Sequence, residues 1–191
     1  MAAPVGRPRD QTVEAKVVAS TFDLLNEEGL GGLSVEGIAT RAGVSKATIY
    51  RRWDSKEELL VDAFACVVEE VTVPDSGDIR EDLVAAVRAM WGFVCDSRAG
   101  EVFPWLVGEI ASGSQIGRRY AAAVIRPRRE MLSGLIGRAV QRGDLRADLD
   151  VDLAVDMITG AVVIRRMLGQ FDQTPQSWPE SLVDTLLAGW S

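Results

Sequence analysis

Histidine is absent from this sequence of 191 residues, and cysteine occurs only as Cys66 and Cys95. The absence of histidine excludes acid–base catalysis by an imidazole and metal sites that need histidine ligands. The sequence also has no glycine-rich phosphate loop, serine nucleophile elbow or cysteine cluster. We therefore predict that the protein is not an enzyme and has no catalytic residues, no metal and no cofactor.

Cysteines and long apolar runs, both scarce here, bear on cellular location. Cys66 and Cys95 each lie among apolar neighbours, which favours buried free thiols over a disulfide; a redox switch that pairs them is the alternative. No apolar run approaches the roughly 18 residues of a membrane-spanning helix, and residues 1–12 lack the apolar region of an export signal. We expect a cytoplasmic protein that does not contact a membrane.

Charge is distributed unevenly along the chain, whose net charge is −7. Residues 1–56 contain eight Lys and Arg against seven Asp and Glu, whereas residues 57–191 contain thirteen against twenty-one. All three lysines, Lys16, Lys46 and Lys56, fall in the first part. Because phosphate repels an acidic surface, we expect contact with nucleic acid only on the N-terminal part.

The segment 34–53 has the pattern of a helix-turn-helix. Ala39 keeps the first helix narrow where the second crosses it, Gly43 permits the positive φ of the turn, and Ile49 packs beneath the second helix. Ser45 is placed to cap that second helix. These residues in register indicate a unit that reads DNA, because the second helix of such a motif enters the major groove.

The second helix is expected to begin after Ser45 and to present hydrogen-bond donors, with one small residue for close approach to a groove. Lys46 and Lys56 each follow a serine cap, where the helix dipole repels a cation unless an anion lies nearby. Backbone phosphates over both helix starts would supply that anion; lysines that point into water are the alternative. Residues 6–9, Gly-Arg-Pro-Arg, form either a minor-groove arm or a solvated tail. The predicted DNA contacts are Ser34, Arg41, Ser45, Lys46, Ala47, Thr48, Tyr50, Arg51, Arg52 and Lys56.

The rest of the sequence has helical periodicity, and no segment alternates with period two over the length of a strand. Before the motif, a helix is predicted over 12–28 with Gly29 as its end. After it, Ser55-x-x-Glu58 is a capping box that opens a helix over 55–72. Further helices are predicted over 79–97, 101–112, 115–142, 151–170 and 177–189. The predicted fold class is therefore all-α.

In its motif the sequence resembles the tetracycline-repressor-like (TetR) family of transcriptional regulators. The matching text is Leu24-Leu-Asn-Glu-Glu-Gly, Leu33-Ser-Val-Glu-Gly-Ile-Ala, Ala42-Gly-Val-Ser-Lys-Ala-Thr-Ile-Tyr and Ser55-Lys-Glu-Glu-Leu-Leu. It covers roughly the first third of the chain, and the length and helical remainder also suit the family. Beyond it, only Gly143-Asp-Leu-Arg-Ala-Asp-Leu-Asp is similar to a recurrent loop of family members.

The resemblance implies an architecture, partners and a mechanism. An N-terminal helix-turn-helix DNA-binding domain, residues 1–54, is followed by a larger helical effector-binding and dimerisation domain, residues 55–191, in which the helix 55–72 links the two. A homodimer places its recognition helices about 34–36 Å apart on a palindromic operator of double-stranded DNA. A small apolar or amphipathic effector in the second domain swings the linking helix and releases the DNA, which is the usual repressor logic of the family.

Aromatic and flexible apolar residues of the second part, Phe93 and Val94 among them, supply the kind of surface that lines small-molecule pockets. The same residues fit an ordinary hydrophobic core, and only the family resemblance favours a cavity among them. The candidates for effector binding are Met90, Trp91, Phe103, Trp105, Met131 and Met157.

The segment 151–168 is apolar on too much of its circumference for a surface helix, so it needs cover on more than one side. The resemblance places the dimer interface on the final two helices, which pack with their two-fold mates as a four-helix bundle. The predicted interface residues are Leu153, Met157, Ile158, Ala161, Arg165, Leu182, Leu186 and Trp190. Burial within the monomer is the alternative for the apolar residues, and a solvated edge is the alternative for Arg165.

Two other functions compatible with the motif stay open. A DNA-binding module that senses no ligand predicts a second domain without a cavity, whereas a sensor predicts an enclosed apolar void near Trp91, Phe103 and Trp105. An architectural protein that coats DNA predicts binding without sequence preference, which competition against random duplex would reveal.

Overall fold

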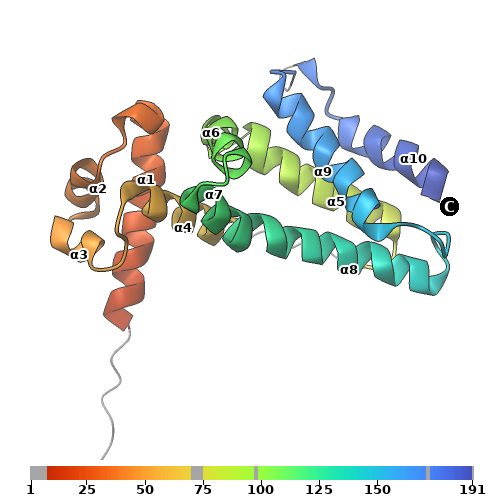
Figure 1. Cartoon of the computed structure of the whole chain (residues 1–191), viewed down its shortest axis with the longest axis horizontal. Coiled ribbons are helices and arrows are strands. Elements are labelled where there is room, and N and C mark those ends of the chain that lie inside the picture. Colours follow the sequence, from red (N-terminus) through yellow and green to blue (C-terminus); the bar gives the residue numbers. More distant parts are fainter. Residues whose placement is uncertain (1–7, 70–74, 97–98, 171–172, 191) are drawn as a thin grey trace, which may run out of the picture.

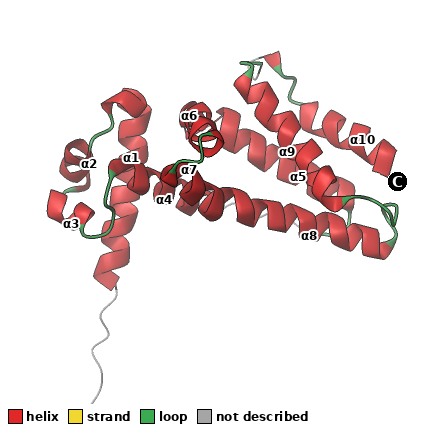
Figure 2. Ribbon diagram, in the orientation of Figure 1, coloured by secondary structure: helices red, strands yellow, loops and turns green. Residues whose placement is uncertain are grey.

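The computed structural model describes residues 8–69, 75–96, 99–170 and 173–190, and all regular structure in these ranges is helical (Figures 1 and 2). The prediction of an all-α fold is confirmed. None of the described helices is long and apolar enough to cross a membrane. Residues 6 and 7 of the expected N-terminal arm and the last residues of the helix expected over 55–72 lie outside the described ranges.

The N-terminal unit consists of α1 (Pro8–Gly32), α2 (Val35–Ala42) and α3 (Lys46–Tyr50). α1 begins earlier than the predicted start near residue 12 and runs past Gly29, where the backbone is kinked with φ 67° and ψ −176°. A glycine adopts this positive φ without the steric penalty of a Cβ. Gly29 therefore breaks the helix as predicted, although a further helical stretch follows it.

The turn between α2 and α3 has the geometry that its residues predict. Gly43 ends α2 with φ 67° and ψ 34°, in the left-handed region. Ser45 caps α3, because its Oγ accepts a hydrogen bond from the Thr48 N–H at 3.1 Å. Ile49 and Ala39 are buried at 1% and 4% exposure. These contacts fix the angle between the two helices.

Replacing Gly43 with Val should destabilise the folded chain by about 1–2 kcal/mol, because a β-branched residue is strained in the left-handed region. Urea denaturation monitored by circular dichroism measures the change. Gly137→Ala is the matched control, since Gly137 has ordinary helical φ in α8 (Arg126–Arg142) and no atom within 4 Å of an added Cβ. The control should leave stability unchanged or raise it by up to about 1 kcal/mol. Equal stability of the Gly43→Val variant and the unaltered chain would contradict this account of the turn.

Helix α4 (Lys56–Glu69) joins the N-terminal unit to the rest of the molecule. Ser55 caps it by accepting the Glu58 N–H at 3.1 Å, while the Glu58 carboxylate accepts the N–H of Asp54 at 2.6 Å. Phe64, only 1% exposed, makes edge-to-face ring contacts with Phe22 of α1 at 5.5 Å and with Tyr120 at 6.3 Å. One apolar core therefore continues from the N-terminal unit through α4, and a domain boundary near residue 55 stays a prediction.

The larger part of the molecule is a layered helical assembly. The described elements of this part are α5 (Ile79–Trp91), η1 (Gly92–Asp96), α6 (Ala99–Ala111), α7 (Gln115–Tyr120), η2 (Ala121–Ile125), α8 (Arg126–Arg142), α9 (Val151–Met167) and α10 (Trp178–Trp190). Helix α10 packs against α5, and α9 packs against both α5 and α8, so α5 is the central helix of this part (Figure 1).

Two π-helical segments interrupt helices that the sequence predicts as regular. The helix predicted over 79–97 is divided, over the described residues 79–96, into α5 and η1, and residues 115–142 divide into α7, η2 and α8. Pro127 lies two residues after the end of η2 and has no N–H to continue the i→i−4 ladder, which is an ordinary cause of such a local change. The helical register changes at η2, and two residues of η2, Val124 and Ile125, line an apolar cleft.

Candidate nucleic-acid interface and candidate effector cleft

Helix α3 buries one side and exposes the other, at the end of the molecule that lies away from α10 (Figure 1). Ile49 packs into the core, whereas Tyr50 is 51% exposed and the Lys46 side chain is 53% exposed. Ala47 and Arg51 are exposed as well. The surface of α3 is therefore open to a large partner, as a recognition helix requires.

One group of predicted DNA contacts meets in an open groove of about 460 Å³ that crosses the starts of α2 and α4. The predicted residues in this groove are Ser34, Lys46, Tyr50 and Lys56. Lys46 Nζ forms an exposed ion pair with Glu36 at 2.9 Å, while Lys56 Nζ donates to the Leu33 carbonyl at 3.0 Å. An exposed ion pair of this kind contributes at most about 1 kcal/mol, so a phosphate can replace Glu36 as the partner of Lys46.

Two further predicted contacts, Arg41 and Arg52, are paired with acidic residues of the chain itself. Arg41 donates two hydrogen bonds to Glu27, at 2.7 and 2.5 Å, and these bonds raise the pKa of the guanidinium. Arg52 forms an ion pair with Glu14 of α1 and lies 5.4 Å above the ring of Trp53. Thr48, Arg51 and Arg52 line a second hollow of about 210 Å³ beside α1.

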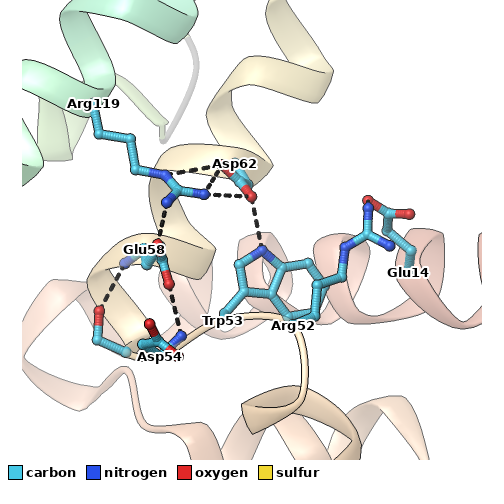
Figure 3. A network of polar contacts seen from close by, with 8 residues as sticks. Glu14, Arg52, Trp53, Asp54, Glu58, Asp62 and Arg119 are labelled. Atoms are coloured by element: carbon cyan, nitrogen blue, oxygen red, sulfur yellow. Dashed lines mark hydrogen bonds and ion pairs between the residues drawn. The ribbon is translucent and has the colours of Figure 1, made fainter.

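A polar network connects α7 to α4 and to the residues that follow α3 (Figure 3). Arg119 of α7 forms ion pairs with Glu58 and, at 3.0 Å, with Asp62 of α4. Asp62 also accepts the indole N–H of Trp53 at 2.9 Å. Trp53 is 2% exposed, so it packs in the core and does not belong to the exposed surface of α3. The network (Arg119, Glu58, Asp62 and Trp53) thus joins α7 to α4 and to Trp53, which follows α3 in the chain.

A predominantly apolar cleft of about 190 Å³ lies between helices of the second domain. Arg128, Arg129, Thr159 and Tyr120 are the lining residues with polar side-chain groups. The other residues that line it are Met90, Phe93, Val94, Phe103, Val124, Ile125 and Val163. Concave apolar surfaces with a few polar groups are the usual form of small-molecule sites.

Of the six predicted effector residues, the structure brings only Met90 and Phe103 to the cleft. Trp91 packs against Trp178, with ring centroids 4.9 Å apart. Trp105 packs against the apolar core that contains Phe64, and Met131 packs against a second apolar core that contains Leu135. Met157 is 44% exposed on the surface. The sequence interpretation missed the whole wall from 120 to 129, although the run Arg126-Pro-Arg-Arg beside apolar residues was a visible signal.

Burial changes the proton affinity of two groups at the polar end of the cleft. It raises the pKa of the Tyr120 hydroxyl and lowers the pKa of the Arg128 guanidinium, because a low dielectric disfavours the charged form of each. An arginine guanidinium is not deprotonated in proteins at neutral pH. The cleft therefore contains a cation partly withdrawn from water.

The predicted dimer contacts divide into exposed and buried residues. Leu153 is 56% exposed, but Ile158, Leu186 and Trp190 are at most 8% exposed and belong to the core of the chain itself. These three side chains are buried within the chain, which is the alternative that the sequence left open for them, so little of their surface is available to a second copy.

Arg165, Ala161 and Leu182 are partly buried in the chain. The Arg165 guanidinium donates to the Thr174 hydroxyl at 3.1 Å and lies 4.8 Å above the ring of Trp178. Three apolar residues that the sequence interpretation left out of the interface are exposed on α9, namely Ile164, Met167 and Leu168.

The geometry defines a class of protein: a helix-turn-helix transcriptional regulator with a helical second domain. Family models match both parts. The model of bacterial regulatory proteins of the tetR family matches residues 17–63, and the model of the tetracyclin repressor-like C-terminal domain matches residues 73–186. The chain belongs to the TetR family of transcriptional regulators, which confirms the resemblance and the prediction that it is not an enzyme.

Relatives cover nearly the whole chain. It is 32% identical over 185 residues to YdeS of Bacillus subtilis, an uncharacterised HTH-type transcriptional regulator, with 96% of this chain and 92% of that one covered. The crystal structure of the TetR family transcription regulator SCO0332 is similar with a TM-score of 0.77 and 31% identity, covering 94% of this chain and 98% of that one. FadR of Bacillus subtilis, solved in complex with stearoyl-CoA, shares the fold with a TM-score of 0.69 and 20% identity, covering 93% and 99%.

Proposed function

We propose that this regulator is a ligand-responsive repressor that binds a palindromic operator as a homodimer and leaves it when a small molecule occupies the second domain. One observation carries the proposal. Helix α7 contributes Tyr120 to the cleft wall and, from the neighbouring position, places Arg119 on α4. A molecule that moves this wall therefore also moves the contact that holds the DNA-binding unit.

On the DNA side, the exposed residues of α3 are suited to the major groove. Ala47 permits close approach, and Lys46, Tyr50 and Arg51 supply donors for bases and phosphates. Ser34 and Lys56 lie beside them at two helix starts, where backbone N–H groups favour a phosphate. The acidic remainder of the chain restricts binding to this face.

Replacing Lys46 or Tyr50 with Ala should weaken operator binding by about tenfold or more, because each dimer loses the same contact twice. Fluorescence anisotropy with an operator selected from random duplex measures the change, and for Lys46→Ala the salt dependence should also become shallower. Lys16→Ala is the matched control, since Lys16 is an exposed lysine of α1 outside both α3 hollows. Unchanged affinity of both α3 variants at moderate salt would contradict the assigned role.

A second copy of the chain is suggested by the outer face of α9. Its exposed apolar residues, Leu153, Met157, Ile164, Met167 and Leu168, recur at helical spacing within about a third of the circumference. Gly160 lies in the same stripe and is exposed, so a partner helix can approach closely. A contiguous apolar stripe on an otherwise charged surface is typical of an interaction site. A single recognition helix contacts too few base pairs for useful discrimination, which also favours a homodimer.

The cleft favours a sensor over a module that binds no ligand. Its walls are predominantly apolar, and a regulator of the same fold, FadR, was solved with stearoyl-CoA. Binding there and binding to the operator are then linked by one coupling free energy, typically about 1–3 kcal/mol. The network of Arg119, Glu58, Asp62 and Trp53 is the proposed route of that coupling.

A further inference from the structure

Tyr120 places a phenolic hydroxyl in the wall of the apolar cleft. The residue is the last of α7, is only 1% exposed and lines the cleft. Its ring packs edge-to-face against the ring of Phe64, with centroids 6.3 Å apart, and this contact holds it against the core. The small exposed part of Tyr120 is therefore reached through the cleft.

The Tyr120 hydroxyl has no hydrogen-bond partner among the residues that the structure describes. Within the same residues it is not one of the fully enclosed polar atoms without a partner, so its oxygen keeps contact with the space of the cleft. A hydroxyl among apolar side chains is stabilised when it gains a hydrogen bond. A ligand can therefore bind this group without breaking a contact within the chain.

The other polar side chains of the cleft already interact within the chain. Arg129 forms an ion pair with Asp156 of α9, and Arg128 also has an interaction partner. The Thr159 hydroxyl donates to the Val155 carbonyl at 2.8 Å. An anionic ligand gains an arginine only at the expense of one of these contacts, whereas an uncharged ligand leaves them intact.

The protonation of Tyr120 determines which ligand group it suits. Burial raises the pKa of the Tyr120 hydroxyl, because a low dielectric disfavours the phenolate, and this effect exceeds the opposing effect of the Arg128 charge. The hydroxyl therefore keeps its proton at neutral pH and can donate it to a carbonyl or ether oxygen.

The volume of the cleft limits the size of the ligand. An apolar cavity of about 150 Å³ in another protein binds benzene, and this cleft measures about 190 Å³. Apart from Tyr120, Thr159 and the two arginines, the residues that line it are apolar. The ligand is therefore about the size of an aromatic ring with one small substituent, and most of its surface is apolar.

We propose that the cleft binds a compact, uncharged, mainly apolar molecule whose single acceptor oxygen receives a hydrogen bond from the Tyr120 hydroxyl. This inference rests on the proposed function, because it identifies the class of molecule that the second domain senses. The ligand is then attached directly to α7, next to Arg119, whose ion pairs reach α4. Acetophenone is a suitable probe, with ethylbenzene as an analogue without the acceptor and benzoate as an anion of similar size.

Calorimetric titration of the full chain with the three probes tests the proposal. Tyr120→Phe removes only the hydroxyl, so it should lower the affinity for acetophenone by about three- to tenfold, the usual contribution of one neutral hydrogen bond. The affinity of this variant for ethylbenzene should stay the same or rise. Benzoate should bind the unaltered chain about tenfold or more weakly than acetophenone, because its charge is buried only by displacing an existing contact.

Thr159→Val is the matched control, because it removes the other hydroxyl of the cleft, whose proton is already donated to Val155. This control should keep the affinity for acetophenone of the unaltered chain. Circular dichroism establishes that both variants fold. The comparison of acetophenone with benzoate uses the unaltered chain, so it decides the charge of the ligand even if a variant does not fold.

Three results would overturn the inference: an affinity for acetophenone that Tyr120→Phe leaves unchanged or lowers no more than Thr159→Val does, benzoate binding as tight as acetophenone binding, or no saturable binding of acetophenone. Operator binding is measured separately, without a probe. If acetophenone fails to bind while a specific operator is still bound, the ligand class is wrong and DNA recognition stands. If the probes bind as expected but no operator is found, the cleft assignment stands and the proposed function fails.

Discussion

A variant that carries both Met157→Asp and Ile164→Asp is expected to sediment as a monomer and to bind the operator about 100-fold more weakly, or worse, than the unaltered chain. Both side chains are exposed on α9, at 44% and 53%, so the substitutions leave the core of the chain intact. In a dimer they would bury four carboxylates without partners. Loss of the second recognition helix then removes half of the operator contacts. Sedimentation velocity and anisotropy titration measure the two effects.

The matched control adds two negative charges elsewhere, as Gln115→Asp with Gln141→Asp, at exposed positions of α7 and α8. This control should remain dimeric. Circular dichroism of all variants establishes that folding is retained. A Met157→Asp, Ile164→Asp chain that still sediments as a dimer would show that the interface lies elsewhere.

Replacing Arg119 with Ala is expected to disconnect the cleft from the DNA-binding unit. The substitution leaves Glu58 and Asp62 of α4 without their common cation, and Glu58 is only 17% exposed, so stability should fall by about 1–2 kcal/mol. The ratio of operator affinities without and with a saturating ligand of the cleft, about 5- to 150-fold for typical coupling, should fall towards one. Binding of that ligand itself should persist, because Arg119 does not line the cleft.

Arg118→Ala is the control for this experiment. Arg118 is the exposed neighbour of Arg119 in α7, and its guanidinium donates to the Gly113 carbonyl of the preceding loop. The control should keep the full ratio. If Arg119→Ala keeps the ratio of the unaltered chain, coupling does not depend on the network and another contact between α4 and the second domain must transmit it.

The parts of the fold that the sequence predicts well are those decided by local chemistry. A positive φ at Gly43, the cap at Ser45 and the buried Ile49 each follow from interactions within a few residues. Local interactions of the same kind begin α5 and α9, where the side chains of Asp78 and Asp150 accept backbone N–H groups. Helix type and approximate ends could therefore be predicted without knowledge of the tertiary structure.

The cleft could not be predicted in this way, because its wall comes from elements that are distant in the sequence. Met90 lies in the last turn of α5, Phe103 lies in α6, Tyr120 ends α7 and Thr159 lies in α9. Helical periodicity shows that each residue is on an apolar face but not which faces leave a space between them. The π-helical turns at η1 and η2 shift the register further, and nothing in the sequence interpretation anticipated them.

The outer face of α9 illustrates a related limit. Met157 and Ile158 are adjacent, and both are apolar, yet the first is 44% exposed and the second is fully buried. The apolar pattern of this helix indicates that two of its sides are covered by other helices. It does not indicate which side packs against helices of the same chain. Ile158→Asp, the substitution that the sequence alone suggests for breaking the dimer, would unfold the core and test nothing about association.

The central claim is that the exposed surface of α3, presented twice by a homodimer, reads an inverted repeat in DNA. The most direct test is to sequence the genomic fragments that the purified chain retains, beside the fragments retained by a Lys46→Ala, Tyr50→Ala variant. We predict one enriched motif with two-fold symmetry and half-sites about one helical turn apart, or a multiple of it, which the variant fails to enrich. Enrichment without sequence preference, or the same motif retained by the variant, would contradict the claim.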